Sequence, residues 1–242
     1  MLVSTRRIPA DKRRKLLLAA ARAVFAREGY RGATALEVGR EAGVSETLVL
    51  KHFGFEFKEI KLPLDTPAFH RDVVQYTPSK RVPVLIDGSL HIWDSLAIAE
   101  YLNEKVQGRA WPADPTARAV ARAVSAEMHS GFAALRTHWP MKAVGTAQVE
   151  LPPAGKDDVA RIQQLWQECR TQYGSRGPWL FGDYSIADAM YAPVALRFRH
   201  YGAKLANAAA AAYYQQLVQD PHVQNWTRDA EAEVATNFGA GR

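Results

Sequence analysis

Strand-forming patterns occupy only a small part of this chain of 242 residues, and helix-forming patterns fill most of the rest. Between residues 55 and 93, short runs of β-branched and large apolar residues are bounded by Pro, Asp and Gly, and one Asp-Gly pair lies between two such runs as in a β-hairpin. From residue 95 onward, apolar residues recur at helical spacing. The chain is therefore predicted to be mostly α-helical with a small β-sheet.

The first 54 residues are strongly basic, whereas the remainder is neutral. They hold 11 Lys and Arg against 5 Asp and Glu, and this excess equals the formal net charge of +6 of the whole chain. A basic segment joined to a neutral body predicts an anionic partner for that segment, such as DNA.

A secretory signal and a membrane span are not expected. The apolar run that follows the first basic residues, 16–21, contains six residues, whereas the core of a secretory signal needs roughly 7–15. No apolar run approaches the roughly 18 residues that cross a bilayer. The sequence thus predicts a cytoplasmic protein with no membrane partner. The single cysteine, Cys169, excludes a disulfide framework and is expected to be a small core residue.

Three helices are predicted within the basic segment. Residues 11–28 carry an apolar stripe flanked by arginines. Thr34 opens a second helix with a capping box, and Ser45 caps a third helix that spans residues 45–53. A tight turn that contains Gly43 joins the second helix to the third, which is typical of a helix-turn-helix whose second member enters the DNA major groove.

The segment contains a distinctive ordered set of residues: Phe25, Gly29-Tyr30, Thr34, Ala42-Gly43-Val44-Ser45 and Lys51-His52-Phe53-Gly54. With this set, the segment resembles the DNA-binding head of the tetracycline-repressor (TetR) family. The resemblance implies a set of DNA-facing residues, namely Thr34, Ser45, Thr47 and Lys51. Leu50 departs from the family, which often has an aromatic residue there, and the family's Ser-Lys-Glu step is missing after Gly54. A basic three-helix cap with a solvated charged face is the alternative interpretation.

From residue 55 onward, the pattern predicts a strand at 55–64, a short helix at 67–76, a hairpin at 82–93 and a helix from Asp94. An all-helical half follows, with a helix at 117–135 and a loop at 151–155. Four stretches are distinctive: Arg81-Val82-Pro83-Val84-Leu85, Asp94-Ser95-Leu96-Ala97-Ile98, Gly182-Asp183-Tyr184-Ser185-Ile186-Ala187-Asp188, and Asp220-Pro221-His222-Val223 with Trp226. On these stretches, about residues 50–235 resemble a glutathione transferase, and the third stretch resembles the capping box in the helical half of that family.

The resemblance implies a glutathione site formed by Val82, Pro83, Asp94 and Ser95. Pro83 would follow a cis peptide bond, so that the backbone of Val82 is free to pair with the cysteinyl unit of the ligand. Asp94 and Ser95 would hold the γ-glutamyl group, because a helix N-terminus offers free N–H groups to a carboxylate. Taken singly, Ser95 could simply cap a helix and Pro83 could only shape a turn. No metal site is predicted, and His129 and His138 are interpreted as packed or solvated residues.

The usual first strand of a transferase, and the loop that carries its catalytic Ser, Cys or Tyr, are missing from the pattern. The basic head stands in their place, and residues 48–54 fit both families. The missing strand would lie between the strands at 55–64 and 82–86. The facing edges of these two strands are therefore expected to pair directly, to be separated by water, or to move apart because the strand at 55–64 detaches. The helix at 45–53 is expected to stay with the head. The catalytic residue is unknown, and little or no transferase turnover is expected.

The fold prediction has three parts: a three-helix TetR-like helix-turn-helix head (residues 1–54), a truncated thioredoxin-like α/β subdomain (55–107) and an all-helical glutathione transferase C-terminal domain (108–242). The predicted function is that of a glutathione transferase-like homodimer that binds DNA and glutathione. Two alternatives remain open, an active transferase with an atypical N-terminus and a recombined fusion protein with neither activity. Whether the chain is an enzyme is likewise left open.

Overall fold

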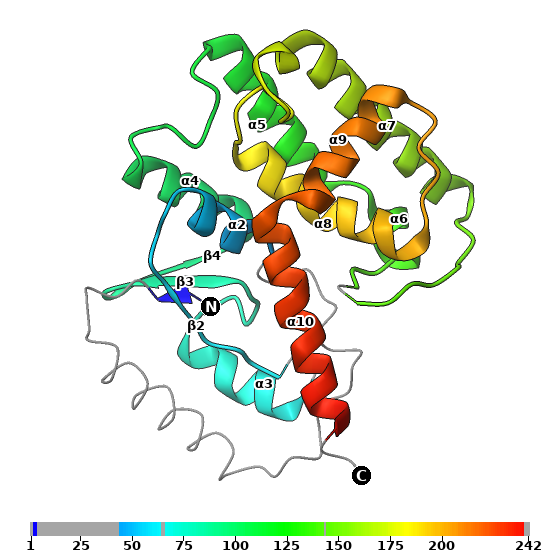
Figure 1. The fold of residues 1–242 in the computed structure, drawn as a ribbon. Helices are drawn as coiled ribbons and strands as arrows, with labels where there is room; N and C mark the ends of the chain where they lie inside the picture. The colour runs from blue at the N-terminus through cyan, green and yellow to red at the C-terminus, as the bar shows by residue number, and fades with distance from the viewer. Residues whose placement is uncertain (1, 4–43, 64–65, 143, 240–242) are drawn as a thin grey trace.

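The structure, a computed structural model, describes residues 2–3, 44–63, 66–142 and 144–239. Its described residues form a mostly helical molecule with a four-stranded sheet at one end (Figure 1). The sheet half contains β1 (Leu2–Val3), α2 (Val44–His52), β2 (Lys58–Glu59), α3 (Pro67–Asp72), β3 (Val84–Asp87), β4 (Leu90–Trp93) and α4 (Ser95–Lys105). The helical half contains α5 (Pro115–Ser130), α6 (Ala133–His138), α7 (Pro153–Tyr173), α8 (Ile186–Tyr201), α9 (Ala208–Gln219) and α10 (Pro221–Gly239).

The predicted hairpin and the helices around it are confirmed. Strands β3 and β4 pair antiparallel with Asp87 opposite Leu90, so the connecting turn is Gly88–Ser89, one residue later than the Asp-Gly signal suggested. The helix predicted at 67–76 is present as α3, continued by a 3₁₀ turn at Val73–Gln75. By contrast, the strand predicted at 55–64 is reduced to the two residues of β2.

The expected gap in the sheet is filled, so the prediction that the first strand is missing is wrong in this respect. The strand order is β2-β1-β3-β4. β1 pairs antiparallel with β2 through Leu2 opposite Glu59, and parallel with β3 through Leu2 opposite Leu85. Unpaired backbone groups at a sheet edge are costly, and two residues at the chain start satisfy them. A two-residue strand is too short to produce a recognisable sequence pattern, which is why sequence analysis missed it.

The boundaries of the helices differ from prediction in two places. The helix expected at 117–135 is divided at Gly131 into α5 and α6. A Cβ atom at Gly131 would stand 2.6 Å from the carbonyl oxygen of Glu127, so only glycine fits there without a shift. The stretch 151–155, predicted as a loop, instead contains the start of α7 at Pro153, a first-turn position that proline tolerates.

The centre of the helical half is α8, of whose 16 residues 14 are buried. Its predicted capping box is confirmed: the backbone N–H and the hydroxyl of Ser185 both donate to Asp188. Asp188 also accepts from the backbone N–H of Leu180 and from the hydroxyl of Tyr213. This carboxylate joins three segments of the core, and burial raises its pKa in spite of these donors.

Helix α2 is docked on the transferase-like body. All residues from Val44 to Leu50 are buried, and the helix contacts α4, α8 and α10. At its end, the N–H of Phe55 donates to the carbonyl of Leu50 and Gly54 adopts a positive φ of 73°, a backbone conformation that glycine adopts without strain. The expectation that this helix stays with the head is therefore wrong, because its apolar face completes the core of the body. The helices predicted at 11–28 and from Thr34 lie outside the described residues.

Two further features complete the architecture. Helix α10 returns from the helical half toward the sheet half (Figure 1). There Glu233 on α10 pairs with Lys61. Among the described residues, no helix combines the length and the apolar character needed to cross a membrane.

Candidate functional site

A cavity of about 580 Å³ lies between the sheet half and the helical half. It is lined by all four residues predicted to bind glutathione, Val82, Pro83, Asp94 and Ser95. The peptide bond between Val82 and Pro83 is cis. A volume of this size falls within the roughly 300–1,000 Å³ typical of small-molecule sites. The structure thus brings together two sequence stretches that are separated along the chain.

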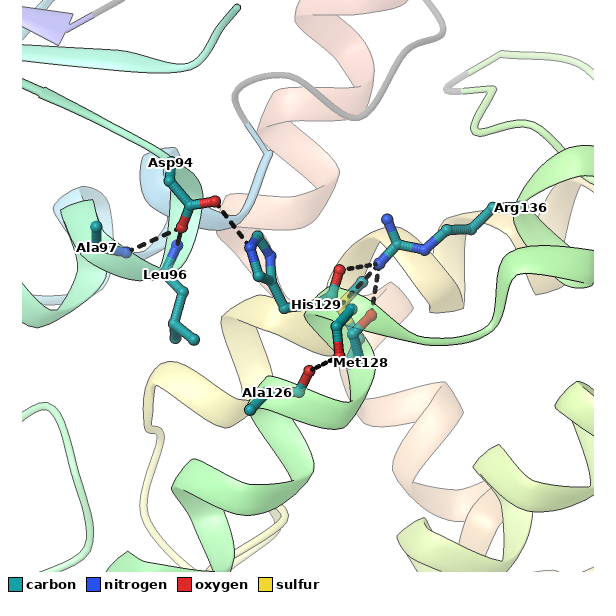
Figure 2. A network of polar contacts seen from close by, with 8 residues as sticks. Asp94, Leu96, Ala97, Ala126, Met128, His129 and Arg136 are labelled. Carbon is teal, nitrogen blue, oxygen red and sulfur yellow. Dashed lines mark hydrogen bonds and ion pairs between the residues drawn. The ribbon is translucent and has the colours of Figure 1, made fainter. Parts of the chain in front are cut away.

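Asp94, not Ser95, caps helix α4. One carboxylate oxygen, Oδ1, accepts hydrogen bonds from the backbone N–H groups of Leu96 at 2.9 Å and of Ala97 at 3.2 Å (Figure 2). Asp94 has a φ of 81°, which is rare for a residue with a side chain and is commonest at functional sites. Ser95 is the first helical residue, and it lines the cavity without serving as the N-cap.

The second oxygen of Asp94 is held from the helical half. The Nε2 atom of His129, in the last turn of α5, lies 2.8 Å from Asp94 Oδ2. The Nη2 atom of Arg136 on α6 donates to the carbonyl oxygens of Met128 and His129, which closes the end of α5 (Figure 2). Sequence analysis treated His129 as packed or solvated, and it missed this contact because no local signal connects two residues 35 positions apart.

The cavity carries charges of both signs. The positive residues Arg81 and Arg136 lie on its wall together with Asp94, beside His129. Apolar lining comes from Met128 on α5 and from Met190 and Pro193 on α8. A peptide with carboxylate and ammonium groups at one end and a less polar part at the other end has matching chemistry.

Ser45 is another cavity residue that sequence analysis did not assign to this site. It lies in the first turn of α2 with a side chain that is 6% exposed, and it lines the same cavity as Ser95. Sequence analysis assigned it instead to DNA contact. A hydroxyl therefore stands at the site although the usual catalytic loop is missing from the sequence pattern.

The residues predicted to face DNA are mostly inaccessible in the described part of the chain. Ser45 is buried, and Thr47 is 3% exposed. Lys51 is half-buried at the end of α2. Thr34 lies outside the described residues. The four DNA contacts stay predictions that require α2 to present another face to solvent.

A separate cluster fastens the end of α2 to α10. The Nε2 atom of His52 lies 3.2 Å from both carboxylate oxygens of Asp220, and its ring stacks on Tyr184 with centroids 3.4 Å apart. The ring of His222 meets that of His52 at 4.4 Å. This cluster is closed by aromatic rings, and no group of three or more His, Cys, Asp or Glu in the described residues is arranged to hold a metal ion.

Comparison with known proteins agrees with both parts of the sequence pattern. Residues 39–104 match the family model of the glutathione S-transferase N-terminal domain, and residues 17–54 match that of bacterial regulatory proteins of the tetR family. The two matches overlap at residues 39–54, the segment that contains α2.

Curated relatives point to the transferase side. The chain is 32% identical to maleylacetoacetate isomerase of Rattus norvegicus over 149 residues, which cover 60% of this chain and 67% of that protein. It is 50% identical to dichloromethane dehalogenase of Methylorubrum extorquens over 34 residues, which cover 14% of this chain and 12% of that protein.

Solved structures share the fold. A glutathione transferase homologue from Burkholderia with bound glutathione is similar with a TM-score of 0.59 at 23% identity, over 84% of this chain and 94% of that chain. Ure2p in complex with glutathione is similar with a TM-score of 0.59 at 22% identity, over 78% of this chain and 96% of that chain. A diazinon-metabolizing glutathione S-transferase of the silkworm Bombyx mori is similar with a TM-score of 0.64 at 17% identity, over 81% of this chain and 96% of that chain.

A thioredoxin-like sheet that packs beside an all-helical half, with a cavity between them, defines the glutathione transferase class of fold. The chain belongs to the glutathione transferase family.

Proposed function

We propose that this protein binds glutathione in the cavity between β3, α4 and α5. The observation that carries the proposal is the convergence of Val82, Pro83, Asp94 and Ser95 on one cavity of suitable size. Ser95 and the guanidinium of Arg81 suit the ligand's carboxylates, and Asp94 suits its ammonium group.

Ser45 is the residue that we propose stabilises the glutathione thiolate. It lies in the first turn of α2, where the helix dipole and free backbone N–H groups favour negative charge. The expectation of little or no turnover rested on the lack of a suitable hydroxyl, and Ser45 removes that reason. Glutathione-dependent conjugation or isomerisation is therefore the chemistry that we assign to the site.

Titration calorimetry of Ser95→Ala tests the site directly. Because Asp94 provides the cap of α4, removal of the Ser95 hydroxyl should leave the free energy of unfolding within about 0.5 kcal/mol of the parent. The affinity for glutathione should fall by about 10- to 150-fold, because a hydrogen bond to a charged group contributes about 1.5–3 kcal/mol. Thr137→Ala removes a hydroxyl from exposed α6 and serves as the matched control. Equal affinity of Ser95→Ala and parent would reject the site.

Ser45→Ala separates binding from chemistry. The proposal predicts nearly unchanged glutathione affinity together with a loss of at least tenfold in any conjugation rate, because the hydroxyl acts on the thiolate. A rate equal to that of the parent would show that another group activates the thiol.

DNA binding through residues 1–54 is the second function that we propose. It is supported by the tetR match and by the basic charge of this segment. A homodimer would supply the paired heads that a twofold DNA site needs. Each phosphate that the head neutralises should add about 0.9 to the slope of log affinity against log salt. A lack of DNA binding at low salt, in protein that binds glutathione, would leave the transferase function alone.

A further inference from the structure

A short loop, residues 77–81, connects the 3₁₀ turn that follows α3 to Val82, one of the predicted glutathione residues. Ser79 and Arg81 in this loop line the cavity. The loop starts from a fixed point, because its first residue, Thr77, donates its backbone N–H to a carbonyl of the preceding 3₁₀ turn at 3.1 Å. The loop is therefore a part of the cavity wall that adjoins the predicted cysteinyl contact.

The hydroxyls of Thr77 and Ser79 are paired within this loop. Their oxygen atoms lie 2.9 Å apart, so one hydroxyl donates its proton to the other. Thr77 Oγ1 also accepts the backbone N–H of Ser79 at 3.2 Å, and Ser79 Oγ accepts that of Arg81 at 3.3 Å. Thr77 is 2% exposed, whereas Ser79 is half-buried and lines the cavity. The direction of the bond between the two hydroxyls decides which of them keeps a proton for a ligand.

Burial determines that direction. A hydroxyl carries one proton to donate and two lone pairs that accept. Among the described residues, Ser79 Oγ is the one acceptor within reach of the Thr77 hydroxyl proton, and a buried donor without an acceptor is costly. Thr77 therefore donates to Ser79. Because Ser79 Oγ then accepts from Thr77 and from the N–H of Arg81, its own proton remains for an acceptor in the cavity.

The proposed site leaves one carboxylate of glutathione to this loop. Asp94 and Ser95 take the γ-glutamyl end of the ligand, whose ammonium and carboxylate share one carbon atom, and the Val82 backbone takes the cysteinyl unit. The glycyl unit follows the cysteinyl unit, so its carboxylate meets residues that adjoin Val82. On one side of Val82 the chain enters strand β3, and on the other side Ser79 and Arg81 line the cavity.

We propose that Ser79 donates a hydrogen bond to the glycyl carboxylate of glutathione, and that Thr77 is the positioning residue that directs the Ser79 proton into the cavity. The inference rests on the proposed glutathione site. Arg81 supplies positive charge to the same carboxylate from an exposed side chain, and Ser79 adds a donor whose direction is fixed by the loop. A carboxylate accepts through two oxygens, so both donors can be satisfied together.

Glutathione and its glycyl ethyl ester test the assignment of the carboxylate. The ester keeps the thiol, the ammonium and the γ-glutamyl carboxylate but replaces the glycyl carboxylate with a neutral group. In calorimetry, Ser79→Ala should bind glutathione about tenfold or more weakly than the parent, because a hydrogen bond to a charged group is lost. The loss for the ester should be about five- to tenfold smaller, since a neutral acceptor forms a weaker hydrogen bond.

The matched control is Ser130→Ala. It removes an exposed serine hydroxyl at the end of α5, which bonds to a backbone carbonyl as an ordinary surface serine does and lies outside the cavity lining. This variant should bind both ligands as the parent does.

Two variants of Thr77 test the positioning role. Thr77→Val keeps the branched shape of the buried side chain but cannot donate to Ser79, so the affinity for glutathione should fall about two- to tenfold, the contribution of one neutral hydrogen bond. Binding of the ester should change less. Thr77→Ser restores the donor and should return the affinity for glutathione to that of the parent. A merely structural role would weaken both ligands alike, and Thr77→Ser, which loses a buried methyl group, would not restore binding.

The outcomes separate the role of Ser79 from the site itself. Ser79→Ala with the affinity of the parent, or with equal losses for glutathione and the ester, overturns the role of Ser79 and leaves the glutathione site standing. Thr77→Val with the affinity of the parent overturns the positioning role of Thr77. A lack of glutathione binding by the parent protein overturns the proposed site, and the roles of Ser79 and Thr77 with it.

Discussion

Asp94 shows how far residue types alone can identify a functional site, and which contacts within that site they cannot predict. The sequence predicts an acid-serine pair at the start of a helix beside the glutathione cavity, and the structure has both residues on the cavity wall. The sequence places the cap at the pair Asp94-Ser95 without choosing between them, because aspartate and serine are about equally good caps; the structure gives the cap to Asp94. His129 could not be found in this way, because its contact with Asp94 depends on the packing of α5 against the sheet half.

Cys169 should be inert toward thiol reagents in the folded protein. Burial raises the pKa of its thiol to about 12, with the charges of Glu168 and Asp188 adding to the effect. Cys169 is 3% exposed within the helical core. We expect no detectable alkylation by iodoacetamide at pH 8 over hours, and one modified residue per chain in 6 M urea. Rapid modification of native protein would contradict the core assignment of this residue.

Helices and the hairpin were largely predictable because apolar periodicity and turn residues are local. The hairpin at 82–93 and the capping box at Ser185 are each encoded within a dozen residues or fewer. β1 was unpredictable, since its two residues gain their structure only from the edges of β2 and β3. The docking of α2 was also unpredictable, because one apolar face of this helix fits either of two neighbours. Residues 39–54 match both family models, so the sequence itself does not choose between them.

The contact between α2 and α10 should weaken in mild acid. Burial, together with the charge of His52, lowers the pKa of His222 below its ordinary value of 6.5. A histidine with a lowered pKa in the folded state contributes stability that is present above pH 6.5 and is lost as the pH falls through the folded-state pKa. Urea unfolding at pH 7.5 and 5 should therefore show a loss of stability that His222→Asn reduces and the control His138→Asn retains.

Asp220 does not contribute to the loss of stability between pH 7.5 and 5. Burial alone would raise its pKa, but the hydrogen bond and charge of His52 outweigh that effect and the pKa is lowered from 3.8. The stability that this carboxylate contributes is present above pH 3.8 and is lost only in stronger acid. An equal pH dependence in His222→Asn and the parent would assign the acid sensitivity to another group.

At the scale of the whole molecule, α2 connects the two proposed functions and sets them in opposition. In the docked state its buried side chains Val44, Leu48, Val49 and Leu50 belong to the core of the transferase-like body. Exposure of four such side chains costs roughly 6–12 kcal/mol at about 1.5–3 kcal/mol each. That cost is comparable to the roughly 4–10 kcal/mol that separates specific from non-specific DNA binding. Sequence-specific DNA contact through Ser45 and Thr47 is therefore disfavoured while the body is folded around this helix.

Thr47 distinguishes the docked from the DNA-facing arrangement in solution. Its hydroxyl oxygen is buried and has no hydrogen-bond partner among the described residues. Thr47→Val replaces that hydroxyl with a methyl group of similar size, so a docked α2 predicts a gain of about 1 kcal/mol in the free energy of unfolding and unchanged DNA affinity. A recognition helix exposed to DNA predicts the reverse, with unchanged stability and a loss of DNA affinity. Urea denaturation and fluorescence anisotropy with a labelled duplex at low salt measure both quantities, and Thr137→Val, at an exposed site on α6, should change neither.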